Sequence, residues 1–268
     1  MLHTLHMLYR FAGAWMKRFR EYRGTLPLSL ATHAVHYGGN LLMIWVLIDR
    51  FQRIGTWSPF EVLLLVAMAD FSYGIANFFV RNSFRSLSED VRTGDFDEFL
   101  IRPMSPLVYY VSKRVEFYDL NHVIFNGVVL VFVFYKLQVS FTVLKVFWLV
   151  VFVAGATVIQ TSFIVITTVL SFWLVKAETF SYFVVNSSSG FANYPISIYP
   201  KAIQMLLTVA LPWAFINFYP ALYLLGKQEF LMFHPIVQFL TPAVAAVMLA
   251  IALLLWRLGL RKYQSTGT

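Results

Sequence analysis

The sequence has no cysteine and few charged residues, and both absences restrict what the protein can be. Without cysteine, the chain can form no disulfide, thiolate nucleophile or cysteine metal site. Only 13% of its 268 residues are charged, against roughly 25% in soluble domains, whereas 59% are hydrophobic. A water-soluble fold could not bury so much apolar surface, so we expect a protein that lies in a lipid bilayer.

Signatures of targeting and catalysis are also missing. Residues 1–24 are basic and contain no continuous apolar run, so we expect no cleavable signal peptide. No G-x-x-x-x-G-K-[ST] phosphate loop is present, and the six histidines form no H-E-x-x-H motif. We therefore expect a chain that is not an enzyme, has no metal site and binds no cofactor itself. The net charge of +8 comes from basic residues beside apolar segments, which favours membrane topology over a nucleic-acid partner.

Long apolar runs predict an all-α polytopic membrane protein with six transmembrane helices. A spanning helix takes about 20 apolar residues, and backbone groups in lipid must be satisfied within the protein. Five spans are predicted at residues 28–48, 60–80, 120–137, 141–174 and 236–258.

Two interpretations remain for the region between the fourth and the last of these spans. In the first, residues 175–200 are a cytoplasmic connection and residues 203–225 are the fifth span. In the second, residues 177–193 are a short fifth span and residues 200–225 form a re-entrant hairpin. Pro212 and Pro220 favour a broken helix, although spans also tolerate proline.

The basic residues predict the orientation of the chain. Residues 1–24 have a basic face and an aromatic, apolar face, which is typical of an amphipathic helix lying on the membrane surface. Most of the 21 lysine and arginine residues lie in this segment, in the 81–118 loop and in the C-terminal tail. Because cytoplasmic loops carry the excess of basic residues, we expect both termini and the 81–118 loop in the cytoplasm.

The 81–118 loop also concentrates acidic residues. Glu89, Asp90, Asp95, Asp97 and Glu98 are five of the 13 acids of the chain. We predict one helix over residues 86–93, a left-handed Gly94, and a second short helix that Asp95 caps with Glu98. On that helix Phe96, Phe99 and Leu100 share a face, which predicts an exposed apolar knob with an acidic rim. Such a knob suits docking to a partner; a solvated loop is the other interpretation.

Residues 91–106, VRTGDFDEFLIRPMSP, follow the pattern I-R-x-G-x-[LF]-[DE]-x-x-L-x-[RK]-P-x-[SN]-P almost throughout. In this the chain resembles ABC-2 type transporter permeases, in which the pattern follows the second span. A looser resemblance to the same family covers residues 188–226, through GFANYP, LP and YPA.

The resemblance implies the membrane subunit of an ATP-driven ABC exporter in the cell membrane, formed by residues 1–268 as one domain. ATPase subunits would bind ATP and Mg²⁺, and a second permease, non-identical or an identical copy, would complete the transporter within membrane lipid. Residues 1–24 would be the connecting helix, and residues 200–235 an extracellular re-entrant region. The implied coupling residues are Asp95, Phe96, Asp97, Glu98, Phe99, Leu100 and Arg102.

Polar residues inside the predicted spans are candidates for a substrate pathway. These residues are His36, Asn40, Asp70 and Asn77. An acid at mid-membrane costs about 2.5–3.5 kcal/mol, so Asp70 should be hydrogen-bonded to a neighbour such as His36 or Asn40, or should serve transport. A proton-coupled secondary transporter that uses Asp70 and His36 is the alternative function, although no inverted repeat supports it.

Overall fold

The computed structural model describes residues 53–115, 120–174, 190–191, 193–229 and 233–264, with a few scattered positions before residue 40. Within these ranges the chain is helical, and the nearest approach to a strand is an isolated bridge between Ile54 and Trp57. The main helices are α3 (Pro59–Arg85), α4 (Leu87–Thr93), α5 (Asp97–Leu100), α6 (Pro106–Lys113), α7 (Leu120–Lys136), α8 (Val143–Val169), α10 (Lys201–Met205), α11 (Phe218–Leu225) and α12 (Thr241–Lys262). Short 3₁₀ or π segments join them: η2 (Leu170–Phe172), η3 (Ile196–Ile198), η4 (Leu206–Ala210), η5 (Pro212–Phe215) and η6 (Pro235–Phe239).

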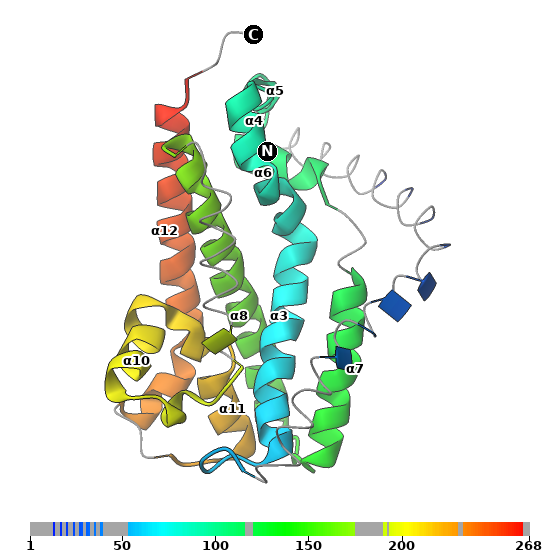
Figure 1. The fold of residues 1–268 in the computed structure, drawn as a ribbon, viewed down its shortest axis with the longest axis vertical. Helices are drawn as coiled ribbons and strands as arrows, with labels where there is room; N and C mark the ends of the chain where they lie inside the picture. The colour runs from blue at the N-terminus through cyan, green and yellow to red at the C-terminus, as the bar shows by residue number, and fades with distance from the viewer. Residues whose placement is uncertain are drawn as a thin grey trace.

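Four long helices form an upright bundle (Figure 1). Helix α3 packs against both α7 and α8, and α12 packs against α8. Three described stretches are long and apolar enough to cross a membrane: Pro59–Arg81, Val143–Phe172 and Thr241–Lys262. They contain 22 to 30 residues, about 33–45 Å of helix. The apolar α7 is shorter, at 17 residues.

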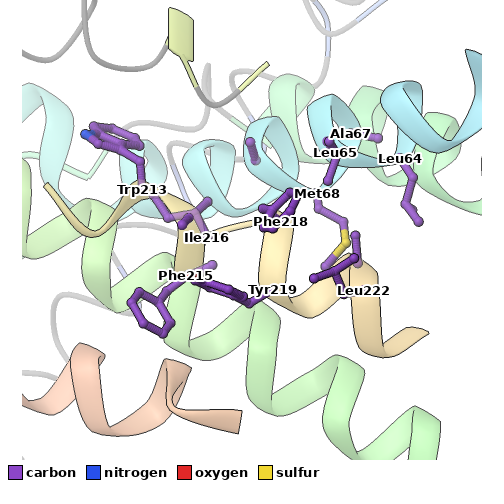
Figure 2. Packing of buried hydrophobic residues seen from close by; sticks show 14 of the residues in the cluster. Leu64, Leu65, Ala67, Met68, Trp213, Phe215, Ile216, Phe218, Tyr219 and Leu222 are labelled. Atoms are coloured by element: carbon purple, nitrogen blue, oxygen red, sulfur yellow. The ribbon is translucent and has the colours of Figure 1, made fainter. Parts of the chain in front are cut away.

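A broken pair of helices lies against the lower part of this bundle. Residues Lys201–Ala210 and Pro212–Leu225 bend by 70° at Leu211, and together they would count as a fourth span. Pro212 explains the break, since its ring removes a backbone donor. Figure 2 shows Phe218 and Leu222 of α11 close to Leu65 and Met68 of α3, and all four are buried.

Polar side chains in the bundle bond across helices. The amide nitrogen of Gln160 on α8 donates to the Ser72 hydroxyl at 2.7 Å and to the Ala69 carbonyl at 3.1 Å, both on α3. The Asn217 side chain donates to the Leu65 carbonyl at 3.0 Å. In an apolar solvent such groups seek protein partners, so these bonds fix α8 and α11 on α3.

Gly74 and Gly155 permit close contacts between helices. A Cβ at Gly74 would lie 3.2 Å from the backbone nitrogen of Val123, so α3 and α7 touch closely there. A Cβ at Gly155 would lie 2.7 Å from the Thr241 side chain, where α12 begins. A larger residue at either position would push the two helices apart.

The helix boundaries confirm some expectations and correct one. The predicted spans 60–80, 120–137 and 141–174 correspond to α3, α7 and α8 with η2. The last span begins at Thr241 and not near residue 236, because Pro235 and Pro242 keep η6 separate from α12. The predicted helix 1–24, span 28–48 and span 177–193 fall almost wholly outside the described residues.

Candidate functional site

Helices α4, α5 and α6 form a cap at one end of the bundle, over residues 86–114. Figure 1 shows this cap at the end where α3, α8 and α12 have their C-terminal ends. The local sequence explains two of the helix boundaries: α4 ends at Gly94, whose φ of 88° suits glycine, and Pro106 occupies the first turn of α6. The predicted helix 86–93 and the left-handed Gly94 are confirmed.

Phe96 is the centre of an aromatic cluster that ties the cap to the bundle. Its ring centroid lies 5.7 Å from Tyr110 of α6, 5.4 Å from Phe172 of η2 and 6.0 Å from Trp256 of α12. It also lies 5.2 Å from Tyr263, just after α12. Phe96 is 0% exposed, so the cap is packed onto the ends of α8 and α12 and does not lie free in solvent.

A buried polar network joins α4 to α6 beneath the same cluster. The Arg114 guanidinium contacts the Asp90 carboxylate at 2.6 Å and 3.0 Å, and the Tyr110 hydroxyl donates to that carboxylate at 2.6 Å. Burial and the hydrogen bond to Asp90 raise the pKa of Tyr110 above its usual range. Burial disfavours the charge of Arg114, yet the hydrogen bond to Asp90 leaves its pKa raised.

A second ion pair joins α5 to α6 near the surface. The Lys113 ammonium donates to both Glu98 carboxylate oxygens, at 2.8 Å and 2.7 Å, and Arg102 approaches the same carboxylate at 3.5 Å. The hydrogen bond from Lys113 lowers the pKa of Glu98. The ammonium of Lys113 also lies 5.2 Å from the centre of the Phe99 ring, so α5 is bound to α6 through charge and through aromatic contact.

The prediction of an exposed apolar knob is wrong for its two phenylalanines. Phe96 and Phe99 are 0% and 1% exposed and point into the protein, because the bundle itself supplies their apolar partners. The exposed apolar side chains of α5 and its C-terminal end are Leu100, at 42%, and Ile101, at 78%. Sequence reasoning missed Ile101, although its place beside Leu100 in an otherwise polar loop was a visible signal.

The predicted capping of the second short helix by Asp95 is also wrong. Helix α5 begins at Asp97, and the exposed Asp95 accepts a hydrogen bond from Thr93 at 2.8 Å. Glu98 does not reach back to the start of the helix, because Lys113 and Arg102 hold its carboxylate. Asp97 is half-buried on the first turn of α5, beside Tyr263, and burial and this carboxylate raise the pKa of Tyr263 to about 12.

The candidate pathway residues are only partly described. Asp70 is half-buried midway along α3 and has no hydrogen-bond partner among the described residues. Asn77, two turns later, is 1% exposed, and neither atom of its amide group bonds to another described residue. His36 and Asn40 lie outside the described residues, so the predicted contact of Asp70 with either stays a prediction.

The bundle also buries polar residues that the sequence analysis did not single out. Asn121, His122 and Asn126 are all buried at the start of α7, and the Tyr73 and His122 rings meet edge to face at 6.0 Å. Among the described residues, no three histidine, aspartate or glutamate side chains gather closely enough to hold a metal ion.

The comparison with protein families agrees with this architecture. The family model described as ABC-2 family transporter protein matches residues 34–267, which is most of the chain and includes the cap. The chain belongs to the ABC-2 transporter family. It is therefore a membrane protein of a transport system, as the apolar helices also indicate. No curated protein and no solved structure is similar enough to this ABC-2 chain to match it.

Proposed function

We propose that this ABC-2 protein is the membrane-spanning subunit of an ATP-driven exporter, and that an ATPase subunit docks on the α4–α6 cap. The family match supports a transport subunit, and the cap supports the place of docking. The ATPase would bind ATP and Mg²⁺, because the chain has no phosphate loop of its own.

The observation that carries this proposal is the burial of Phe96 between the cap and the bundle. A side chain packed against α6, η2 and α12 transmits displacement between them, because protein interiors are close-packed. Phe84 of α3 adds a further link, with its ring 5.7 Å from Trp256. A push on the cap therefore moves the ends of several spanning helices together.

The docking contact is assigned to the exposed side of α5. Leu100 and Ile101 supply the apolar contact, and Asp95, Glu98 and Arg102 form a charged rim around it. This division suits an interface with an apolar centre and a polar edge. Phe96 and Phe99 then support the contact from beneath, and Asp97 borders it.

The orientation follows from the same assignment. An ATPase works in the cytoplasm, so the cap and the end of α12 would face the cytoplasm, and the broken pair would lie at the other face (Figure 1). In this arrangement residues 28–48 and 177–193 complete six spans, and residues 200–235 re-enter from outside. Basic residues in the last turn of α12, Arg261 and Lys262, agree with a cytoplasmic end.

Export would require a second permease, either a non-identical homologue or another copy of this chain. The substrate pathway is proposed along α3, where Asp70 and Asn77 lie, with His36 and Asn40 from the predicted first span. No observation on the described residues favours the alternative proton relay between Asp70 and His36.

The first experiment is affinity purification of the tagged chain from its native membrane, with mass spectrometry of the proteins that co-purify. We expect an ATPase subunit. Leu100→Asp and Ile101→Asp should each release it, because a charge would be buried at the centre of the contact. Leu240→Asp is a matched control, since Leu240 is 41% exposed and lies at the other end of the bundle.

Two outcomes would count against the proposal. Recovery of the chain without an ATPase, under conditions that preserve a known ABC complex, would remove the ATP-driven mechanism. Recovery of an ATPase that Leu100→Asp and Ile101→Asp do not release would move the docking site away from α5.

A further inference from the structure

A groove lies between α7 and α8 at the end of the bundle opposite the cap. The two helices are consecutive and antiparallel, yet each packs mainly on α3 rather than on the other. The space between them is a cavity of about 810 Å³, within the range of ligand-binding pockets. Leu130 and Phe134 of α7 and Leu149 of α8 form its apolar walls, and Lys136 and Gln138 lie at its mouth.

The groove runs from the end of the helices toward the middle of the bundle. Leu130 precedes Lys136 by six residues on α7, which places it about 9 Å deeper along the helix axis. Leu149 lies a similar distance inside α8 from its first residue, Val143. The groove is therefore apolar and runs along the spanning helices, which suits an acyl chain.

A positive charge, that of Lys136, lies at the mouth of this apolar groove. Lys136 is exposed and has no carboxylate partner among the described residues; its ammonium lies 5.7 Å from the Phe132 ring. Nearby lysines of the same end are already bonded: Lys145 donates to the Leu224 carbonyl at 3.1 Å, and Lys227 pairs with Glu61 at 2.8 Å. A lysine at a helix end in a membrane protein reaches toward the headgroup region, where its charge attracts an anionic headgroup more than a zwitterionic one.

We propose that this groove binds an anionic membrane phospholipid, with an acyl chain between α7 and α8 and the phosphate at Lys136. The Gln138 amide at the mouth can donate to the same headgroup. The site needs only the membrane location of the bundle, so it holds whether or not an ATPase docks on the cap.

The test is a lipid titration of the full-length chain in mild detergent, with bound lipid counted by native mass spectrometry. Phosphatidylglycerol and phosphatidylcholine with identical acyl chains are the two probes. We expect phosphatidylglycerol to bind more tightly, and Lys136→Gln to weaken it about fivefold without changing phosphatidylcholine binding. Lys136→Arg should keep the preference, and Lys201→Gln, at an exposed lysine on α10, should change neither lipid.

A second variant tests the apolar part of the site. Val139→Trp should fill the groove and weaken both lipids, because Val139 lines it beside Gln138. Equal affinity for the two lipids, or unchanged phosphatidylglycerol binding in Lys136→Gln, would show that the groove holds bulk lipid only and would overturn the proposal. A change of oligomeric state in either variant would instead make the groove a contact between copies of the chain, which also overturns it.

Discussion

Phe96 joins the cap to the bundle, since its ring has neighbours on α5, α6, η2 and α12. We predict that Phe96→Ala destabilises the cap by about 3–5 kcal/mol, the usual cost of removing a fully buried phenylalanine. Phe96→Leu, which fills more of the space, should cost less. Hydrogen exchange of α4–α6 measures the effect, with Phe79→Ala as the control because Phe79 is 46% exposed on α3. Native protection of the cap in Phe96→Ala would contradict its role.

Glu98 gives the cap a dependence on pH. Its pKa lies below the usual 4.5, because Lys113 stabilises the carboxylate in the folded chain. The unfolded state therefore takes up a proton first as pH falls. The ion pair contributes fully to the stability of the folded cap above about pH 4.5, and this contribution is lost as pH falls through the pKa of Glu98 in the folded chain. Since Glu98 is 41% exposed, we expect a small effect.

Exchange protection of residues 95–114 at several pH values between 7 and 3 tests this prediction. Glu98→Gln should flatten the response to acid. Glu89→Gln is the matched control, because Glu89 pairs with Arg92 on the surface of α4 and makes no contact between helices. If the Glu98→Gln variant and the parent chain respond equally to acid, the acid sensitivity of the cap does not come from this ion pair.

Among the helices, the junction between α3 and α11 depends on one lysine. The Lys227 ammonium bonds to the Glu61 carboxylate at 2.8 Å and to the Thr56 carbonyl at 2.8 Å, and it lies 4.4 Å from the centre of the Trp57 ring. Glu61 also accepts from the Ser58 backbone at 2.6 Å, at the start of α3. Lys227 thus fastens the end of the broken pair to the beginning of the central helix.

Lys227→Met should destabilise this junction by about 1.5–3 kcal/mol, the usual range for a hydrogen bond to a charged group. Both side chains of the pair are less than one-fifth exposed, so little water can replace the lost contact. Thermal unfolding of Lys227→Met, Glu61→Gln and the double variant measures the coupling, with Lys201→Met as control. If the costs of the two single variants simply add, the two residues are not coupled.

The long helices could be predicted from the sequence because each has an apolar run of membrane length. The predicted 60–80 and 141–174 lie within a few residues of α3 and of α8 with η2. Helix α6 was missed, since its apolar residues follow Pro106 in a segment too short to stand out. Periodicity also grouped Phe96 and Phe99, and both are buried, although Phe96 precedes α5 and Leu100, predicted on the same face, is exposed. It could not show that this face meets the bundle, because the partners come from α6, η2 and α12, far apart in the sequence.

At the scale of the whole molecule, the two ends of the bundle differ in chemistry. The cap end has the Asp90–Arg114 ion pair and an aromatic cluster, and the other end has the broken pair and the α7–α8 groove. An ATPase can act on only one of these ends, and the cap is the end where a push reaches several spans. The proposed mechanism therefore requires a fixed orientation in the membrane, with the cap in the cytoplasm.

The absence of cysteine makes this orientation directly measurable, because any labelled thiol must be an introduced one. Ser105→Cys places a thiol at the exposed start of α6 in the cap, and Ser140→Cys places one in the exposed turn between α7 and α8. With a membrane-impermeant maleimide, we expect intact cells to label Ser140→Cys and not Ser105→Cys. Vesicles with the cytoplasmic face outward should reverse the result. Labelling of Ser105→Cys in intact cells would put the cap outside, where no ATP-driven subunit could reach it, and the docking proposal would have to be abandoned.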